Sequence, residues 1–412
     1  MAGTLYQNMP SVILFDDPSV RTQLLPFTFT RPVAGIRCGI LTVAEKWGRW
    51  LETTPSYLTQ GYLQPLYPQA ISDAFLYING CLCPNQELVR AMVDLPLGAV
   101  LRSARDRSIL AVHTSSATWD PSTDTVPLTE YIFADEYISI HNLWDIYIEN
   151  GAQIAADYML LTAHRQSAPI TDPFTKCYFP ENIFVEEGAT IRAAILNAED
   201  GPIYIGRHAT VSEGAIIQGP FAMGEGSVVA QGAKVRPNTT LGPYCKVGGE
   251  INNSVLFGYS NKAHDGYLGN SVLGEWCNLG ANTNNSNLKN DYSDVKLYSY
   301  TTRALENTGK IFCGLFMGDY TKAGISTMFN TGTVVGVNVN VFGAGFQPKH
   351  IPSFSWGGQA EGFATYRFDK AVTVIRETMR RRQVDFDEEK ETMLRAVFEE
   401  SSKFRIGSSS ME

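Results

Sequence analysis

The chain has 412 residues, which at about 150 residues per domain predicts two or three domains. Its 33 Lys and Arg and 42 Asp and Glu residues give a formal net charge of −9. This balance argues against nucleic acid as a partner, because a nucleic-acid-binding protein needs a basic face to neutralise phosphates. Hydrophobic content of 44% and charged content of 18% are typical of a globular protein with a full core.

No apolar run approaches the roughly 18 residues of a membrane-spanning helix, so no membrane partner is expected. The first apolar run, Val12–Phe15, ends at Asp16 and is too short for a secretory signal. The seven cysteines are scattered and odd in number, which favours reduced thiols rather than a disulfide framework or a zinc site. These features predict a cytoplasmic protein.

Residues 1 to about 170 alternate between strand-like and helix-like segments, a pattern that predicts an α/β layer. The expected strands are Val12–Phe15, Ala74–Ile78, Val100–Arg102, Ile109–His113 and Tyr131–Phe133, and the expected helices are Thr42–Trp50 and Gln86–Val93. His141–Thr162 carries helix-like periodicity and is expected to connect this layer to the next region.

A six-residue repeat dominates the middle of the chain. Ile, Val, Leu or Met occupies positions 205, 211, 217, 223, 229, 235, 241 and 247, and the frame returns at 273, 279 and 317–341. Period six fits a coil whose short strands turn a corner every six residues, with one aliphatic side chain per side pointing inward. Three sides close a coil of about 18 residues. The stretch from about 178 to 348 is therefore predicted to form about nine coils of a parallel β-helix, since a β-sandwich would show a spacing of 8–12 residues.

After Gln347 the pattern becomes helical. Phe368–Arg382 and Phe386–Phe404 are each predicted to form a helix. The expected organisation is an α/β domain over 1–170, a β-helix over 171–349 and a C-terminal helical segment over 350–412.

The segment from Gly258 to Ser271 breaks the six-residue frame and is expected to be a loop extruded from the coil, where function is often carried. It contains His264, with Lys262 and Tyr267 nearby. A histidine with a pKa near neutral can remove a proton from an attacking nucleophile. A lone surface histidine with no function is the alternative interpretation.

Three runs resemble one known family. Ser260–Asn270 (SNKAHDGYLGN), Trp276–Thr283 (WCNLGANT) and Ser286–Lys289 (SNLK) are similar to the acetyltransferase half of the bifunctional sugar-1-phosphate nucleotidylyltransferase/N-acetyltransferases, the UDP-N-acetylglucosamine diphosphorylase-like enzymes. Val235-Arg236-Pro237 matches the family's Leu-Arg-Pro, and Phe312–Gly324 resembles its archaeal branch. The similarity spans roughly 200 to 345 and implies a left-handed β-helix built from hexapeptide repeats.

The resemblance also implies roles for single residues. His264 would be the general base on the amine of a hexosamine 1-phosphate, which attacks the thioester of acetyl-CoA. Sugar-phosphate binding falls to Arg236, Tyr267, Asn278, Asn287 and Lys289, and acetyl-CoA binding to the backbone around Ala281 and Ala323. Family members are homotrimers with acetyl-CoA between neighbouring β-helices.

This chain departs from the family pattern at two places. Asn282 stands where the family has the second glycine of Gly-Ala-Gly-Thr. Asn252 and Asn253 lie where a lysine is expected before the histidine, which bears on phosphate binding and on the identity of the substrate.

The N-terminal region resembles the nucleotidylyltransferase signature over Arg21–Pro32 (RTQLLPFTFTRP). The glycine-rich phosphate loop is absent, with Asp16-Asp17-Pro18-Ser19 in its place, the signature lysine falls on Val33, and the later Gly-Asp reads Gly80-Cys81. Asp16 and Asp17 are weak candidates to bind Mg²⁺, and Arg21, Arg31 and Arg37 to bind the phosphates of an NTP; all five could equally be structural. In an active domain a sugar 1-phosphate would attack the α-phosphate of the NTP and release pyrophosphate.

Three hypotheses follow. The first is an enzyme of nucleotide-sugar synthesis with an acetyltransferase β-helix and a divergent nucleotidyltransferase domain. The second is a UDP- or dTDP-sugar pyrophosphorylase whose β-helix is only a trimer scaffold. The third is a non-catalytic sugar-nucleotide-binding protein.

Overall fold

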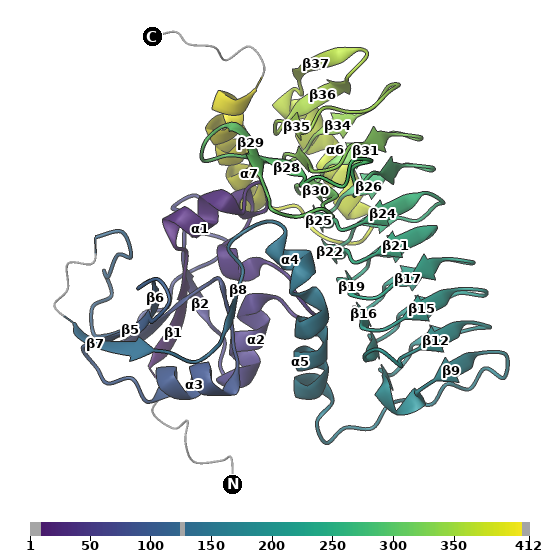
Figure 1. The fold of residues 1–412 in the computed structure, drawn as a ribbon. Coiled ribbons are helices and arrows are strands. Elements are labelled where there is room, and N and C mark those ends of the chain that lie inside the picture. The colour runs from purple at the N-terminus through teal and green to yellow at the C-terminus, as the bar shows by residue number, and fades with distance from the viewer. Residues whose placement is uncertain (1–9, 124–127, 406–412) are drawn as a thin grey trace. The chain divides into compact units, whose positions relative to one another are not determined.

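Figure 1 shows the computed structural model, which describes residues 10–123 and 128–405. The chain divides into two compact units. The first unit contains the described residues up to Leu24 together with 30–36 and 41–142. The second contains 25–29, 37–40 and the chain from Leu143 onward, so two short N-terminal segments belong to it.

The first unit is built on a six-stranded mixed sheet in the order β2-β1-β3-β6-β5-β7. Its strands are β1 (Ser11–Phe15), β2 (Ser56–Leu58), β3 (Phe75–Asn79), β5 (Ala99–Ser103), β6 (Ile109–Thr114) and β7 (Thr129–Phe133). Strand β1 lies parallel to both its neighbours, whereas β6 is antiparallel to β3 and β5. A separate short pair joins β4 (Leu82–Cys83) to β8 (Ile138–Ser139).

The helices of this unit are α1 (Pro18–Gln23), α2 (Val43–Trp50) and α3 (Gln86–Val93), with a 3-10 turn at Val33–Gly35. Thr42 caps α2 through a capping box with Glu45, and Asn85 caps α3, so side-chain oxygens accept the first free amides. The predicted α/β layer is confirmed.

In the second unit, residues predicted as one connecting helix form α4 (Asp145–Ile148) and α5 (Asn150–Thr162). Helix α5 is anchored by Asn150. Its amide oxygen accepts hydrogen bonds from the backbone N–H of Gly39 (2.7 Å) and the hydroxyl of Thr240 (3.1 Å), and its amide nitrogen donates to the carbonyl of Asn238 (2.8 Å). A 3-10 turn at Phe27–Phe29 also belongs to this unit.

The remainder of the second unit is a parallel β-helix, as predicted, whose coils are stacked in Figure 1 from β9 to β36. Its first face comprises β10 (Ile183–Val185), β13 (Ile203–Ile205), β16 (Phe221–Met223), β19 (Thr239–Leu241), β22 (Val255–Gly258), β25 (Val272–Glu275), β30 (Leu315–Met317), β33 (Thr333–Val335) and β35 (His350–Ile351). The second comprises β11 (Thr190–Ile191), β14 (Thr210–Val211), β17 (Val228–Val229), β20 (Lys246–Val247), β23 (Asn261–Lys262), β26 (Asn278–Leu279), β31 (Lys322–Ala323), β34 (Asn340–Val341) and β36 (Ser355–Gly358).

The third face comprises β9 (Lys176–Tyr178), β12 (Ile195–Asn197), β15 (Ile216–Gln218), β18 (Lys234–Val235), β21 (Glu250–Asn252) and β24 (Tyr267–Gly269). Beyond β24 the backbone ladder is interrupted, and a separate pair, β27 (Asn284–Asn285) with β32 (Met328–Phe329), follows. A 3-10 turn at Pro180–Asn182 enters the first coil.

The six-residue frame marks the inward-facing side chains. All eight predicted positions from Ile205 to Val247 are buried in one apolar core, and so are Leu273, Leu279 and the later series from Met317 to Val341. Successive strands on a face pair in parallel register, so each coil supplies hydrogen-bond partners for the backbone of the next.

The prediction of an extruded loop at 258–271 is wrong. These residues form ordinary coil strands β23 and β24, and the frame shifts because the coils are shorter: Val247 pairs with Lys262, fifteen residues along, whereas Val229 pairs with Val247, eighteen along. The true insertion lies between β27 and β30. It contains the antiparallel hairpin β28 (Lys296–Ser299) and β29 (Ala304–Asn307).

The β-helix ends in an antiparallel turn, where β36 pairs with β37 (Gly362–Thr365). The predicted C-terminal helices are confirmed as α6 (Phe368–Arg380) and α7 (Glu388–Glu400), followed by a 3-10 turn at Ser401–Phe404. Asp387 caps α7, and Arg382 donates to the amide oxygen of Asn261 in β23 (3.1 Å). All seven cysteines are free thiols, and among the described residues no helix is long and apolar enough to cross a membrane.

Candidate functional site

Four side chains meet on the outer surface of the third face, around the hydroxyl of Tyr267. That oxygen accepts hydrogen bonds from the amide nitrogens of Asn287 (3.0 Å) and Asn252 (3.4 Å). Asn287 also donates to the amide oxygen of Asn270 (2.7 Å). The network joins strands β21 and β24 to the start of the insertion, and it brings together two of the residues predicted from the sequence, Tyr267 and Asn287.

Gly269 determines where the Tyr267 ring lies. A Cβ at position 269 would stand 2.2 Å from the Tyr267 hydroxyl oxygen and 2.5 Å from the ring, so the phenol rests directly over this glycine. A larger residue would displace the hydroxyl from its asparagine partners.

Two further asparagines hold strand β24 where the backbone ladder is interrupted. The side-chain oxygen of Asn284 accepts from the backbone N–H of Tyr267 (2.8 Å). The buried amide of Asn285 accepts from the N–H of Gly269 (2.9 Å) and donates to its carbonyl (3.0 Å), as a neighbouring peptide group would. No sequence motif identified Asn270, Asn284 or Asn285 as site residues; the asparagine-rich run 282–287 was the available signal.

His264 lies in the corner between β23 and β24 and is exposed. Within the described part of the chain its imidazole makes no hydrogen bond, so both ring nitrogens are accessible to a ligand. Its backbone carbonyl accepts a hydrogen bond from Lys262 Nζ at 2.5 Å. The side chain of Lys262 is directed into the coil rather than out of it.

The remaining predicted residues of the β-helix lie at several places. Arg236 is exposed after β18 on the third face, with Glu250 Oε1 3.8 Å from its guanidinium. Asn278 lies on the second face, in register with Asn261 and Lys322.

Lys289 is in the insertion, where its ammonium donates to Ser293 and lies 3.6 Å from Asp291.

The two alanines predicted at the acetyl-CoA site differ in their surroundings. Ala281 is in the corner after β26, and its carbonyl accepts from the N–H of Ser326 (2.7 Å). Ala323 is an inward-facing core residue of β31.

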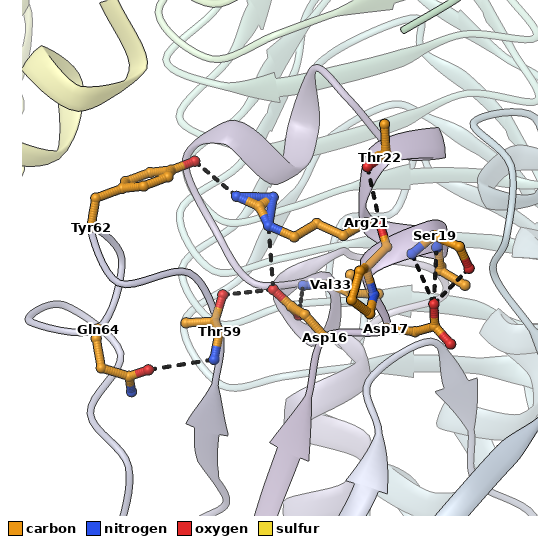
Figure 2. A network of polar contacts seen from close by, with 11 residues as sticks. Asp16, Asp17, Ser19, Arg21, Thr22, Val33, Thr59, Tyr62 and Gln64 are labelled. Atoms are coloured by element: carbon orange, nitrogen blue, oxygen red, sulfur yellow. Dashed lines mark hydrogen bonds and ion pairs between the residues drawn. The ribbon is translucent and has the colours of Figure 1, made fainter. Parts of the chain in front are cut away.

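A second cluster of polar residues lies in the first unit, at the end of β1 (Figure 2). Asp16 is buried; one carboxylate oxygen accepts from the N–H of Val33 (2.7 Å) and the other from the hydroxyl of Thr59 (2.6 Å). Arg21 Nε lies 3.7 Å from Asp16, and its terminal nitrogen donates to the Tyr62 hydroxyl (2.8 Å). Burial raises the pKa of Asp16, and Arg21 opposes this effect.

Asp17 caps the N-terminus of α1. One of its carboxylate oxygens accepts from the N–H (2.9 Å) and hydroxyl (2.6 Å) of Ser19 and from the N–H of Val20 (3.4 Å), as Figure 2 shows. The first free amides of the helix, which in a phosphate-binding turn would face the ligand, are therefore bonded to an internal anion.

These carboxylates do not fit a Mg²⁺ site. Asp16 is engaged by Val33, Thr59 and Arg21, and Asp17 by the start of α1. Among the described residues no group of three or more His, Cys, Asp or Glu side chains could hold a metal ion.

The predicted arginines of the N-terminal half are also engaged within the protein. Arg31 is buried. Arg37 belongs to the second unit, where its guanidinium donates to the carbonyls of Phe257 (3.0 Å) and Ile40. Its donors therefore fix a segment of the β-helix unit.

Part of the chain resembles a known protein family. Residues 12–166, less than half of the chain, match a family model described as sugar nucleotidyl transferase. Comparison with curated proteins gave no match.

Several solved structures are similar to about half of the chain. UDP-N-acetylglucosamine acyltransferase from Francisella novicida is 11% identical, with 57% of this chain and 86% of that one covered and a TM-score of 0.26. The N-acyltransferase AntD from Bacillus cereus, solved with dTDP and coenzyme A, is 13% identical, with 51% and 93% covered and a TM-score of 0.21. At such low scores the assignment of the fold rests on this chain's own strand register.

Proposed function

We propose that the protein is a transferase of nucleotide-sugar biosynthesis that N-acetylates a hexosamine 1-phosphate with acetyl-CoA on the third face of its β-helix. The observation that carries the proposal is the network of Tyr267, Asn252, Asn270 and Asn287 around strand β24, together with the exposed His264 in the corner that precedes this strand. The match of residues 12–166 to a sugar nucleotidyl transferase model supports this class of substrate.

The residues have the chemistry that the reaction requires. The His264 imidazole removes a proton from the substrate amine as the nitrogen lone pair forms a bond to the thioester carbonyl carbon. Collapse of the tetrahedral intermediate breaks the carbon–sulfur bond, and the thiolate of coenzyme A leaves and takes up a proton. The amide nitrogen of Asn252 and the Tyr267 hydroxyl supply neutral donors for sugar hydroxyls or for the developing oxyanion, and the amide oxygen of Asn287 can accept from a sugar hydroxyl.

The phosphate of the substrate would be bound by Arg236 and Lys289. Both are exposed or half-exposed, and each has an acidic neighbour at more than 3.5 Å, so exchange of that neighbour for a phosphate costs little. Asn278 and the backbone around Ala281 and Ala323 would contact substrate or acetyl-CoA from the adjacent face. In this assignment 171–349 carries acyl transfer, 1–170 is a divergent sugar-nucleotidyltransferase-like domain and 350–412 is a C-terminal helical segment, in a cytoplasmic homotrimer.

The test follows release of free thiol from acetyl-CoA with glucosamine 1-phosphate as acceptor. We expect release by the wild type and a fall of about 100-fold or more in His264→Ala, because a general base contributes that much. His208→Ala is the matched control, since His208 is also an exposed histidine in a coil corner and should be dispensable. Absence of release from the wild type across several amino-sugar phosphates would refute the proposal.

A second candidate is nucleotidyl transfer in the first unit, favoured by the family-model match over 12–166. The Asp17 carboxylate at the start of α1 opposes it, because that position would have to accept an anionic ligand. Pyrophosphate release from an NTP and a sugar 1-phosphate, unchanged in His264→Ala, would establish this activity. A raised melting temperature with nucleotide sugar but no turnover would favour a binding protein.

A further inference from the structure

Lys262 is a charged residue placed inside the β-helix. It follows Val247 in the inward column of the second face and precedes Leu279, both buried aliphatic residues of the core. The Lys262 side chain is itself 0% exposed. An aliphatic residue would pack here without desolvating a charge, so the hydrogen bonds of the ammonium must offset its desolvation.

Those hydrogen bonds go to the corner that carries His264. Lys262 Nζ donates to the backbone carbonyls of His264 (2.5 Å) and Asp265 (3.0 Å). The corner closes tightly around the ammonium: Gly266 has φ of +122°, and a Cβ there would lie 3.2 Å from Nζ and 2.3 Å from the Thr283 carbonyl. Burial lowers the pKa of Lys262 to about 8, and the nearby charge of Asp265 opposes this effect.

The same corner is tied to the coils on both sides. The carbonyl of Asp265 accepts from the N–H of Asn282 (3.0 Å), and that of Gly266 accepts from the N–H of Glu250 (3.1 Å). Lys262 therefore fixes, from inside, the orientation of two peptide groups whose outer side presents the imidazole.

We propose that Lys262 is a positioning residue for His264: its buried ammonium anchors the 264–265 carbonyls and so orients the imidazole on the outer surface. This inference rests on the proposed acetyltransferase function for its kinetic consequence, whereas the structural anchoring can be measured without activity.

The test compares Lys262→Met with Leu279→Met in the full chain. Both variants place a flexible apolar side chain in the same inward column, but only the first removes the anchor. For Lys262→Met we expect kcat to fall about tenfold or more with KM for acetyl-CoA within about twofold, because misorientation of a base affects the chemical step. Stability should be retained or increased, since a buried charge is removed.

Hydrogen exchange supplies the readout that does not depend on activity. In Lys262→Met the amides of Glu250 and Asn282 should exchange about tenfold faster, while that of Gly232, bonded to Glu213 at the equivalent corner of an earlier coil, should not change. A folded Lys262→Met with wild-type kcat and wild-type exchange would overturn the proposal. If the wild type transfers no acetyl group, the proposed function fails, and exchange at Glu250 and Asn282 alone decides whether Lys262 anchors the corner.

Discussion

At the scale of single residues, the site depends on a glycine as much as on the polar side chains. Gly269 lies under the Tyr267 phenol, and the hydroxyl reaches Asn252 and Asn287 only because no Cβ is present. Asn285 complements this arrangement by pairing with both backbone groups of Gly269. The position of the Tyr267 hydroxyl therefore depends on the absence of a side chain at Gly269 as well as on its hydrogen bonds to Asn252 and Asn287.

Gly269→Ala tests this dependence. The new methyl group would lie 2.2 Å from the Tyr267 hydroxyl, so we expect the ring to rotate away and acetyl transfer to fall about tenfold, in a protein that still folds. Gly258→Ala is the control, because the nearest atom to its Cβ would be 3.5 Å away. Equal activity of the two variants would show that the Tyr267 hydroxyl is not needed.

The sequence could identify site residues that belong to local motifs, but not residues that act through contacts between distant parts of the chain. His264, Tyr267 and Asn287 were identifiable from motifs, and the structure joins Tyr267 to Asn287. Asn270 and Asn285 act through contacts across coils, which no local pattern encodes. Asp17 was proposed as a metal ligand, and its N-cap role depends on where α1 begins.

At the scale of elements, the hairpin β28–β29 packs through an aromatic cluster around His350. The His350 ring is stacked on Tyr298 with centroids 3.5 Å apart and meets the edge of Tyr300 at 5.4 Å. Burial lowers the pKa of His350 to about 4. The folded protein therefore holds this histidine neutral across the physiological range.

This cluster should make stability sensitive to acid. Because the folded pKa lies below the unfolded value, the contribution of His350 is complete above pH 6.5 and is lost as pH falls toward 4. We expect the wild type to lose about 2.5 kcal/mol of unfolding free energy between pH 7 and pH 4.5 that His350→Phe, which keeps the stacked ring, does not lose. Chemical unfolding at both pH values measures this difference. The exposed His164→Ala should follow the wild type, and an equal slope for His350→Phe would contradict the assignment.

Strands and helices were predicted to within a few residues wherever a local period was strong, as for Gln86–Val93 and the six-residue frame. The early segments 25–29 and 37–40 were assigned to the N-terminal domain, yet they group with the β-helix unit. Phe27 packs on Phe257 with ring centroids 5.0 Å apart, and Ile40 donates its N–H to Asp157 (2.8 Å). Such contacts span over a hundred residues and leave no periodic signal.

At the scale of the whole molecule, the proposed trimer predicts a particle of three times the chain mass of 45.4 kDa in sedimentation equilibrium. Ile195 and Ile216 are register neighbours on the outer third face, and both remain substantially exposed in the single chain. We expect Ile195→Lys with Ile216→Lys to shift the mass toward the monomer, because two charges would be buried at an apolar contact. Leu97→Lys, on an exposed residue of the first unit, should leave the mass unchanged. A monomeric wild type would refute the trimer.

The antiparallel turn at the end of the β-helix affects whether β-helices of identical chains can join end to end into insoluble fibres. A parallel ladder has an open edge at its last strand, where an identical chain could add its own first strand and continue indefinitely into a fibre. Strand β37 runs against β36, and Gly357 approaches Gly362 so closely that a Cβ would stand 2.0 Å from its carbonyl oxygen. The antiparallel strand β37 occupies the outer hydrogen-bonding edge of β36, and so it blocks the addition of a further parallel strand to this face.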